Sequence, residues 1–210
     1  GKLLVLNGDV PLIESQTLKG LIKFHENKNA EASIITTRLE NPFGYGRVFL
    51  KNDQIEKIVE EKDCNNHQKT NQVINLGIYC FDYKSLKSTL TKIKNNNRQK
   101  EYYLTDAIFL LNKAVSYKIT NSDEIKGINN RVQLSECEEI IQKKLKKLHM
   151  LNGVTFINPI STTISEDCKI GKDVVIECNT HIRGNTTIEN NCIIGPNTFI
   201  DSSFIKTNSI

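Results

Sequence analysis

The chain has 210 residues, of which 38% are hydrophobic and 25% are charged, as is ordinary for a globular protein. This length allows one large domain or two small ones. The net charge of +4 is too small to indicate a nucleic-acid partner. No run approaches the roughly 18–20 apolar residues of a membrane span, so we expect neither nucleic acid nor membrane as a partner.

The six cysteines form no C-x-x-C pair, and no histidine lies at the spacing of a zinc finger, so zinc is not expected. Several cysteines fall within apolar patterns, which is typical of reduced, buried thiols. We therefore expect a cytoplasmic protein. The cysteines are Cys64, Cys80, Cys137, Cys168, Cys178 and Cys192.

The first part of the chain predicts alternating strands and helices. Residues 2–6 and 32–37 read as buried strands, and Ser15 between them is expected to cap a helix. A strand, a helix and a strand at this spacing predict a parallel α/β unit. Residues 55–61 alternate as a half-exposed strand does, and residues 73–81 are nearly all apolar, as in a central strand.

Two helices and a strand follow. We expect the helices over residues 83–94 and 105–114 and the strand over residues 115–120. Thr105 begins the second helix, and capping explains this residue without any ligand.

Ser135 and Glu138 mark a further helix. They fit the S-x-x-E capping box, in which each end satisfies a free amide of the first turn. The pattern predicts a helix from Ser135 that stops at Asn152-Gly153, with a lysine-rich outer face. We interpret it as a connector between two domains.

The C-terminal part repeats isoleucine at every sixth position, seven times in succession. A period of six excludes a helix, which repeats about every 3.6 residues, and simple strand alternation. It predicts a chain that turns a corner every six residues and points one isoleucine inward per side, with three sides to each coil of a parallel β-helix. The positions are Ile164, Ile170, Ile176, Ile182, Ile188, Ile194 and Ile200.

Asp9 is the first candidate for chemistry. It directly follows a predicted strand, and ligands of open α/β sheets bind at the carboxyl ends of strands. Gly8 lets a ligand approach the backbone, and a lone carboxylate suits Mg²⁺. Taken alone, however, this residue favours the alternative, an aspartate that organises the turn before Pro11.

Three further positions can be explained either by a bound ligand or by local structure alone, and both explanations stay open. Glu60 can accept hydrogen bonds from sugar hydroxyls, although a solvated strand end is the more common explanation. Asn75 lies within an apolar strand, where an unpartnered amide costs about 1–3 kcal/mol, so a ligand or the backbone must pair with it. Gly46, in a GYG sequence, fits either a niche for a substrate group or a plain turn.

Six motifs in this order resemble those of one family. They are LNGDVPLI, NPFGYGRV, IVEEKD, INLGIYCF, EYYLTD and GINNRVQLS, and the hexapeptide repeat follows them. The family is the bifunctional N-acetylglucosamine-1-phosphate uridylyltransferase / glucosamine-1-phosphate N-acetyltransferase. The resemblance implies a Rossmann-like α/β nucleotidyltransferase domain over residues 1–134, a linker helix over 135–152, and the first coils of a left-handed parallel β-helix over 153–210.

The resemblance also implies the site residues. Asp9 and Asn129 match the Mg²⁺ ligands of the family, although asparagine is also a common turn residue. The match at Asn7 is weaker, because some members have tyrosine there. The positions implied to bind the substrates are Asn7, Gly8, Asp9, Gly46, Glu60, Asn75, Tyr103, Thr105 and Asn129.

The implied reaction transfers UMP from UTP to N-acetylglucosamine 1-phosphate. It gives UDP-N-acetylglucosamine, a cell-wall precursor, and pyrophosphate, and it needs Mg²⁺ but no protein nucleophile. The family also acetylates glucosamine 1-phosphate with acetyl-CoA and forms homotrimers through the β-helix.

The sequence departs from the family at both ends. The first residue is Gly1 rather than methionine, and the family's glycine-rich phosphate loop and acetyltransferase histidine are not found; His181 is on an early coil. We therefore expect a piece of a longer polypeptide that is inactive alone. The alternatives are another sugar-1-phosphate nucleotidyltransferase with a β-helix tail, such as a glucose-1-phosphate type, and a non-catalytic assembly module.

Overall fold

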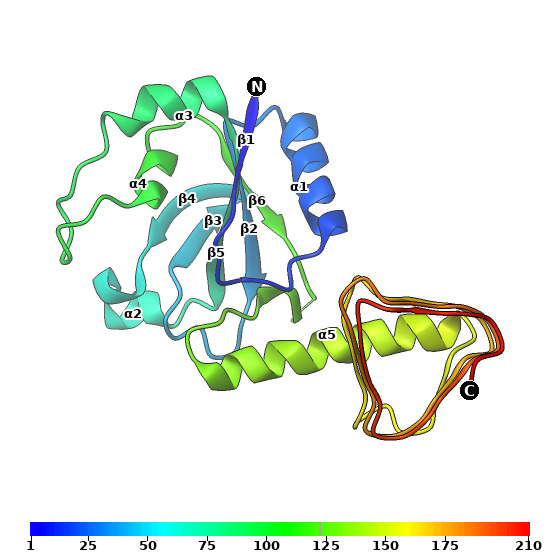
Figure 1. Cartoon of the computed structure of the whole chain (residues 1–210). Helices are drawn as coiled ribbons and strands as arrows, with labels where there is room; N and C mark the ends of the chain where they lie inside the picture. Colours follow the sequence, from blue (N-terminus) through cyan, green and yellow to red (C-terminus); the bar gives the residue numbers. More distant parts are fainter. Residues whose placement is uncertain (122) are drawn as a thin grey trace. The chain divides into compact units, whose positions relative to one another are not determined.

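The computed structural model describes residues 1–121 and 123–210, and it divides into two compact units, residues 1–128 and 129–210 (Figure 1). No helix among the described residues is both long and apolar enough to cross a membrane.

The first unit is built on a mixed six-stranded sheet with the strand order β1-β5-β2-β6-β4-β3. β2 and β6 run parallel, and the other neighbours are antiparallel. The strands are β1 (Lys2–Val5), β2 (Ala32–Arg38), β3 (Arg47–Lys51), β4 (Gln54–Val59), β5 (Val73–Asp82) and β6 (Ala114–Lys118). The helices are α1 (Ser15–Lys28), α2 (Asn66–Lys69), α3 (Tyr83–Leu90) and α4 (Leu104–Ile108), with 3₁₀ turns at Glu61–Asp63 and Asp123–Ile125.

Helices cover both faces of this sheet. α1 lies against one face and α3 and α4 lie against the other, as Figure 1 shows. Alternate residues of β5 therefore enter two separate cores: Ile78 and Cys80 pack with α1, whereas Tyr79 and Phe81 pack with α3 and α4. This burial on both faces explains why residues 73–81 are almost all apolar.

The predicted α/β architecture is confirmed, and several details of it were wrong. β1 and β2 are not neighbours, because β5 inserts between them and runs antiparallel to both. The cap of α1 is Glu14 rather than Ser15, and α4 begins at Leu104 after Tyr103, so Thr105 lies inside the helix. α3 and α4 are also shorter than expected, because tight turns follow both.

The second unit begins with α5 (Arg131–Leu151), which starts four residues before the predicted Ser135. Asn130 caps it: its side chain accepts a hydrogen bond from the Gln133 amide at 3.0 Å. The Gln133 side chain in turn accepts from the Asn129 amide at 2.7 Å. A polar pair one turn earlier thus does what the Ser135-Glu138 box was expected to do.

Nine short strands follow α5 and stack into three parallel sheets, β13-β10-β7, β14-β11-β8 and β15-β12-β9. Neighbours in each sheet lie one coil apart, so Ile164, Ile182 and Ile200 are in register on one side. Six of the seven repeat isoleucines are buried and Ile170 is partly buried. The strands are β7 (Thr155–Phe156), β8 (Thr163–Ile164), β9 (Lys169–Ile170), β10 (Val175–Ile176), β11 (His181–Arg183), β12 (Thr187–Ile188), β13 (Ile193–Ile194), β14 (Phe199–Asp201) and β15 (Phe204–Ile205).

The predicted parallel β-helix with three sides to a coil is thus confirmed, and its first coil is closed by α5. The Gln142 side chain accepts from the Ile164 amide at 2.9 Å and donates to the Ile164 carbonyl at 2.8 Å. Lys146 donates to the carbonyls of Thr162 and Pro159, and burial lowers the pKa of this lysine. Gln142 and Lys146 thus form hydrogen bonds with backbone groups in and next to β8, the terminal strand of its sheet.

All six cysteines are free thiols, and five of them are buried. Burial raises the pKa of the Cys64, Cys80 and Cys168 thiols. These groups therefore stay protonated and behave as small apolar side chains.

Candidate functional site

A bulge in β5 forms the centre of the candidate site. Ile34 of β2 faces Tyr79 and Thr36 faces Asn75, so one residue of β2 is opposite three of β5. Within the bulge Gly77 has a φ of +71°, which favours glycine. A Cβ there would also lie 2.1 Å from Asn7 Nδ2, so the side chain that follows β1 packs directly on this glycine.

Asn75 has partners within the protein. Its Oδ1 accepts from the Gly77 amide at 3.0 Å, and its Nδ2 donates to the Tyr79 hydroxyl at 2.8 Å. Its backbone amide donates to the Gly46 carbonyl at 2.9 Å, which ties β5 to the GYG loop. The buried amide therefore pairs with the backbone and with a tyrosine, and one N–H and one oxygen lone pair of its side chain have no partner among the described residues.

Glu60 joins the GYG loop to α4. Its Oε1 accepts from Thr105 Oγ1 at 3.1 Å, and a Cβ on Gly46 would lie 3.0 Å from its Oε2. Thr105 is thus a partner of Glu60, and it does not cap a helix as predicted. Glu60 is half-buried just after β4, whereas the sequence taken alone favoured a solvated strand end.

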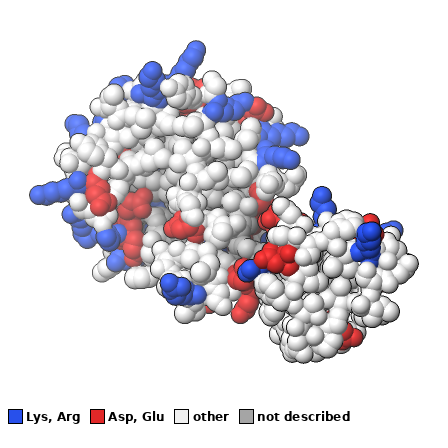
Figure 2. All heavy atoms as spheres, in the orientation of Figure 1, with Lys and Arg blue, Asp and Glu red and all other residues white. Residues whose placement is uncertain are grey.

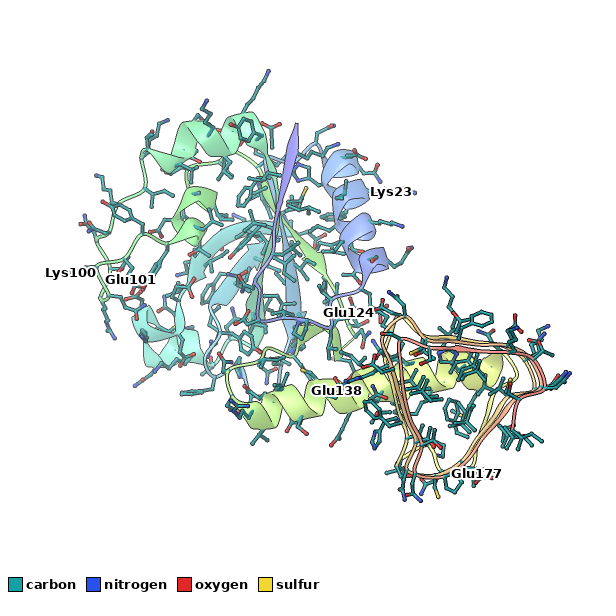
Figure 3. All side chains as sticks on the ribbon, viewed as in Figure 1. Lys23, Lys100, Glu101, Glu124, Glu138 and Glu177 are labelled. Atoms are coloured by element: carbon teal, nitrogen blue, oxygen red, sulfur yellow. The ribbon has the colours of Figure 1, made fainter. Side chains whose placement is uncertain are left out.

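A cavity of about 280 Å³ lies beside this pair. It is lined by Glu60, Thr105, Tyr103 and the carboxylates Asp63 and Asp106. The loop before α4, on which Figure 3 labels Glu101, adds Asn96 and Asn97. Ile58 and Val59 add an apolar part, and the mostly polar lining is suited to a hydroxyl-rich molecule.

The carboxylates at this cavity are held at an electrostatic cost. Burial raises the pKa of Glu60, the hydrogen bond from Thr105 offsets part of that rise, and the charges of Asp63 and Asp106 add to it. Burial also raises the pKa of Asp106, with a contribution from Asp63. On the face visible in Figure 2, acidic side chains of the first unit gather toward its middle, whereas basic ones lie mostly around its outline.

We expect Glu60→Gln to stabilise the first unit at neutral pH. Because the pKa of Glu60 is raised on folding, protonation of Glu60 favours the folded state. This contribution to the free energy of unfolding is complete below the ordinary pKa of glutamate, and it is lost as the pH rises through the raised pKa of the folded state. Ionised Glu60 therefore costs stability at pH 7, and glutamine removes that cost. The gain should vanish near pH 4, about the ordinary pKa of glutamate.

Urea unfolding followed by tyrosine fluorescence measures this effect, because all six tyrosines lie in the first unit and the chain has no tryptophan. Glu56→Gln, at an exposed position of β4, is the matched control and should give no such gain. A gain of equal size at pH 7 and pH 4 would contradict the electrostatic explanation.

The loop after β1 carries Asn7, Gly8 and Asp9, all of them exposed. The Asp9 carbonyl accepts from the Ile128 amide at 2.7 Å, which ties this loop to the end of the first unit. The Asp9 carboxylate also acts on Tyr45 of the GYG loop: burial raises the pKa of Tyr45, and the charge of Asp9 raises it further.

The structure thus connects most of the predicted site residues within the first unit. Contacts run from Asn7 to the β5 bulge, from Asn75 to Gly46, and from Gly46 through Glu60 to Thr105. Tyr103 lines the same cavity, and its hydroxyl accepts from Gln99 at 2.7 Å. Asn129 is the first residue of the second unit, and its convergence with Asp9 stays a prediction.

Two features of the site were not found from the sequence. Arg47 is 1% exposed and forms a 2.6 Å ion pair with Glu61, and it also donates to the Tyr45 carbonyl of the GYG loop. Tyr79 holds the Asn75 amide. The signal for Arg47 was a charge directly after GYG and before the apolar run of residues 48–50 in the same strand.

The first unit is a mixed α/β sheet with a polar site along one strand and two loops, and the chain continues as a hexapeptide β-helix. This combination defines a class of transferases with a β-helical extension. The chain belongs to the nucleotidyl transferase family, because the model of that family matches residues 1–152. The family model "Bacterial transferase hexapeptide (six repeats)" matches residues 167–202.

Curated relatives carry the name "Bifunctional protein GlmU". One from Prochlorococcus marinus (strain NATL2A) is 50% identical over 99% of this chain and 47% of its own length. One from Synechococcus sp. (strain CC9605) is 46% identical over 99% of this chain and 46% of its own length. The chain thus spans about half the length of the curated relatives it matches, and the resemblance drawn from the six motifs is confirmed.

Among solved structures, a putative glucose-1-phosphate thymidylyltransferase from Bacillus anthracis aligns with a TM-score of 0.50 and 16% identity. The alignment covers 66% of this chain and 54% of that one. At this identity the likeness concerns the fold alone, and it agrees with a nucleotidyltransferase-type α/β architecture.

Proposed function

We propose that the protein that carries this sequence transfers a uridylyl group from UTP to N-acetylglucosamine 1-phosphate and releases pyrophosphate. The observation that carries this proposal is the connected set Gly46, Glu60, Asn75 and Thr105 beside a polar cavity, in a chain of the nucleotidyl transferase family. The relatives named as bifunctional proteins support the same conclusion.

In this proposal a phosphate oxygen of the sugar 1-phosphate attacks the α-phosphorus of UTP, and pyrophosphate leaves. Such a transfer depends on positioning and charge neutralisation rather than on a protein nucleophile. Asp9 and Asn129 supply carboxylate and amide oxygens, which are the ligands that Mg²⁺ prefers, and the ion would neutralise charge on the phosphates.

The residues themselves fit this role. The Asp9 side chain is exposed at the end of a strand, and its charge is felt at Tyr45. Hydrogen bonds hold the backbone on both sides of the Ile128–Asn129 peptide bond, from Ile128 to Asp9 and from Asn129 to Gln133. Asn7 and Gly8 would contact the nucleotide-sugar beside the metal.

The sugar would occupy the neighbourhood of Glu60. Its carboxylate can accept hydrogen bonds from sugar hydroxyls, and Thr105 keeps it in place. Gly46 leaves the space beside the Glu60 carboxylate open for the sugar, because a side chain at this position would contact Glu60. Asn75 and Tyr103 would complete the pocket.

We also propose the finer roles of the relatives for the protein that carries this sequence. These are acetyl transfer from acetyl-CoA to glucosamine 1-phosphate, a homotrimer assembled through the β-helix, and a cytoplasmic location. The hexapeptide family match and the stacked coils support the first two.

The test is turnover by the natural protein that carries this sequence, with UTP, Mg²⁺ and either N-acetylglucosamine 1-phosphate or glucose 1-phosphate. We expect pyrophosphate release with a higher kcat/KM for the N-acetylated sugar. A preference for glucose 1-phosphate would indicate the other nucleotidyltransferase type. No turnover with either sugar would indicate an assembly module.

A further inference from the structure

We propose that Tyr79 is a positioning residue for sugar recognition: its hydroxyl locks the Asn75 amide so that an N–H group faces the bound sugar. The inference rests on the proposed function, since it takes Asn75 as a sugar-binding residue. It gives a role to Tyr79, which lies in the motif INLGIYCF but to which the sequence analysis assigned none.

The bulge of β5 makes this contact possible. In a regular strand, residues four apart are separated by about 13 Å along the strand. Between Asn75 and Tyr79, three residues of β5 lie opposite one residue of β2, and Gly77 has a positive φ. This bulge shortens β5 locally. Tyr79 can therefore turn its hydroxyl to within 2.8 Å of Asn75 Nδ2.

The amide of Asn75 is fixed by two different kinds of partner. The Gly77 amide is a donor, so it requires the oxygen of Asn75 on its side. The Tyr79 hydroxyl accepts from the nitrogen. The Gly77 donor sets which way the amide faces, since a hydroxyl can either accept or donate, and the Tyr79 hydroxyl then holds the nitrogen in that orientation. One N–H and one oxygen lone pair remain for a ligand.

Tyr79 is itself held rigidly. Its ring is 5% exposed and stacks on Phe81 with centroids 5.5 Å apart. Burial, with a smaller contribution from the charge of Glu60, raises the pKa of Tyr79 to about 12, so the hydroxyl is neutral at every physiological pH. The structure gives this hydroxyl no acceptor for its own proton among the described residues.

The free N–H of Asn75 selects the chemistry of the ligand. A fixed donor in a buried strand discriminates strongly in favour of a ligand that carries an acceptor at that point, because otherwise the N–H is left unpaired. The carbonyl oxygen of an acetamido group is such an acceptor, and it is a stronger one than the hydroxyl oxygen that the plain sugar carries in its place. The pair Tyr79–Asn75 thus favours an N-acetylated sugar over the plain sugar.

The variant Tyr79→Phe tests this, because it keeps the ring and its stacking and removes only the hydroxyl. In the natural protein we expect KM for N-acetylglucosamine 1-phosphate to rise about 10-fold, with kcat and the KM for UTP little changed. The preference over glucose 1-phosphate should fall by a similar factor. Tyr83→Phe, which removes a hydroxyl from a half-exposed ring, is the control and should change neither.

A double-mutant cycle separates positioning from general damage. Once Asn75→Ala has removed the amide, adding Tyr79→Phe should have no further effect on KM. In ligand-free protein, the side-chain NH₂ resonances of Asn75 should shift and exchange faster with solvent in Tyr79→Phe. Additive losses in the cycle, or unchanged Asn75 resonances, would overturn the inference.

The failure of this inference is distinguishable from that of the proposed function. If the wild-type protein prefers the N-acetylated sugar but Tyr79→Phe keeps its KM and its preference, the proposed function stands and the positioning role falls. If the wild-type protein turns over neither sugar, both fall together.

Discussion

Asp9→Ala is expected to lower the rate of Mg²⁺-dependent uridylyl transfer by about 10²- to 10³-fold in the natural protein. The carboxylate is the charged member of the proposed ligand pair, so without it the ion is held by neutral oxygen alone. Both the position of the phosphates and the neutralisation of their charge would then suffer. Pyrophosphate release measured over a range of Mg²⁺ concentrations checks the expectation, since a weakened site should need more of the ion.

The fold should survive this change. Asp9 is exposed, and the hydrogen bond that ties its loop to Ile128 uses the backbone carbonyl rather than the side chain. Tyrosine fluorescence in urea should therefore show unchanged unfolding of the first unit. Asp167→Ala removes an exposed carboxylate from the β-helix and should leave the rate unchanged. Full activity of Asp9→Ala would exclude this residue as a metal ligand and would favour a scaffold role.

The β-helix could be predicted from the sequence because its pattern is local. Each isoleucine is placed by a corner only a few residues away, so a period of six translates directly into buried positions on three sides. Ile170 departs, with a partly buried side chain. The start of α5 could not be fixed in the same way, because Asn130-Gln133 and Ser135-Glu138 both have capping chemistry and only the first is used.

The order of the main sheet could not be read from the sequence. Lys2 pairs with Asp82, which lies far along the chain, and no local pattern records such a pairing. For the site, the motifs located Gly46, Glu60 and Asn75 but not what holds them. Those partners depend on the β5 bulge and on a buried arginine, which are consequences of tertiary packing.

That buried arginine underlies the second large effect. Glu61→Ala is expected to lower the free energy of unfolding of the first unit by about 3–5 kcal/mol. Arg47 is 1% exposed, its Nη2 lies 2.6 Å from Glu61 Oε2, and its Nε has no hydrogen-bond partner within residues 1–121 and 123–210. Without the carboxylate, a buried guanidinium would lose its only close counter-charge among the described residues.

Urea unfolding followed by tyrosine fluorescence measures the loss. Glu26→Ala, which removes an exposed ion pair with Lys2 in the same unit, is the matched control and should change little. The double variant Arg47→Met/Glu61→Leu should be far more stable than the sum of the two single changes predicts, because it leaves no unpaired charge.

Function should respond differently from stability in that double variant. Arg47 also donates to the Tyr45 carbonyl and so holds the loop that carries Gly46 against Glu60. A protein whose stability is restored without Arg47 should therefore still bind the sugar 1-phosphate poorly. Restored stability together with wild-type KM in the double variant would show that the ion pair serves the fold alone. If Glu61→Ala lowered the free energy of unfolding by less than 1 kcal/mol, roughly the value of a surface ion pair, solvent would have to reach Arg47.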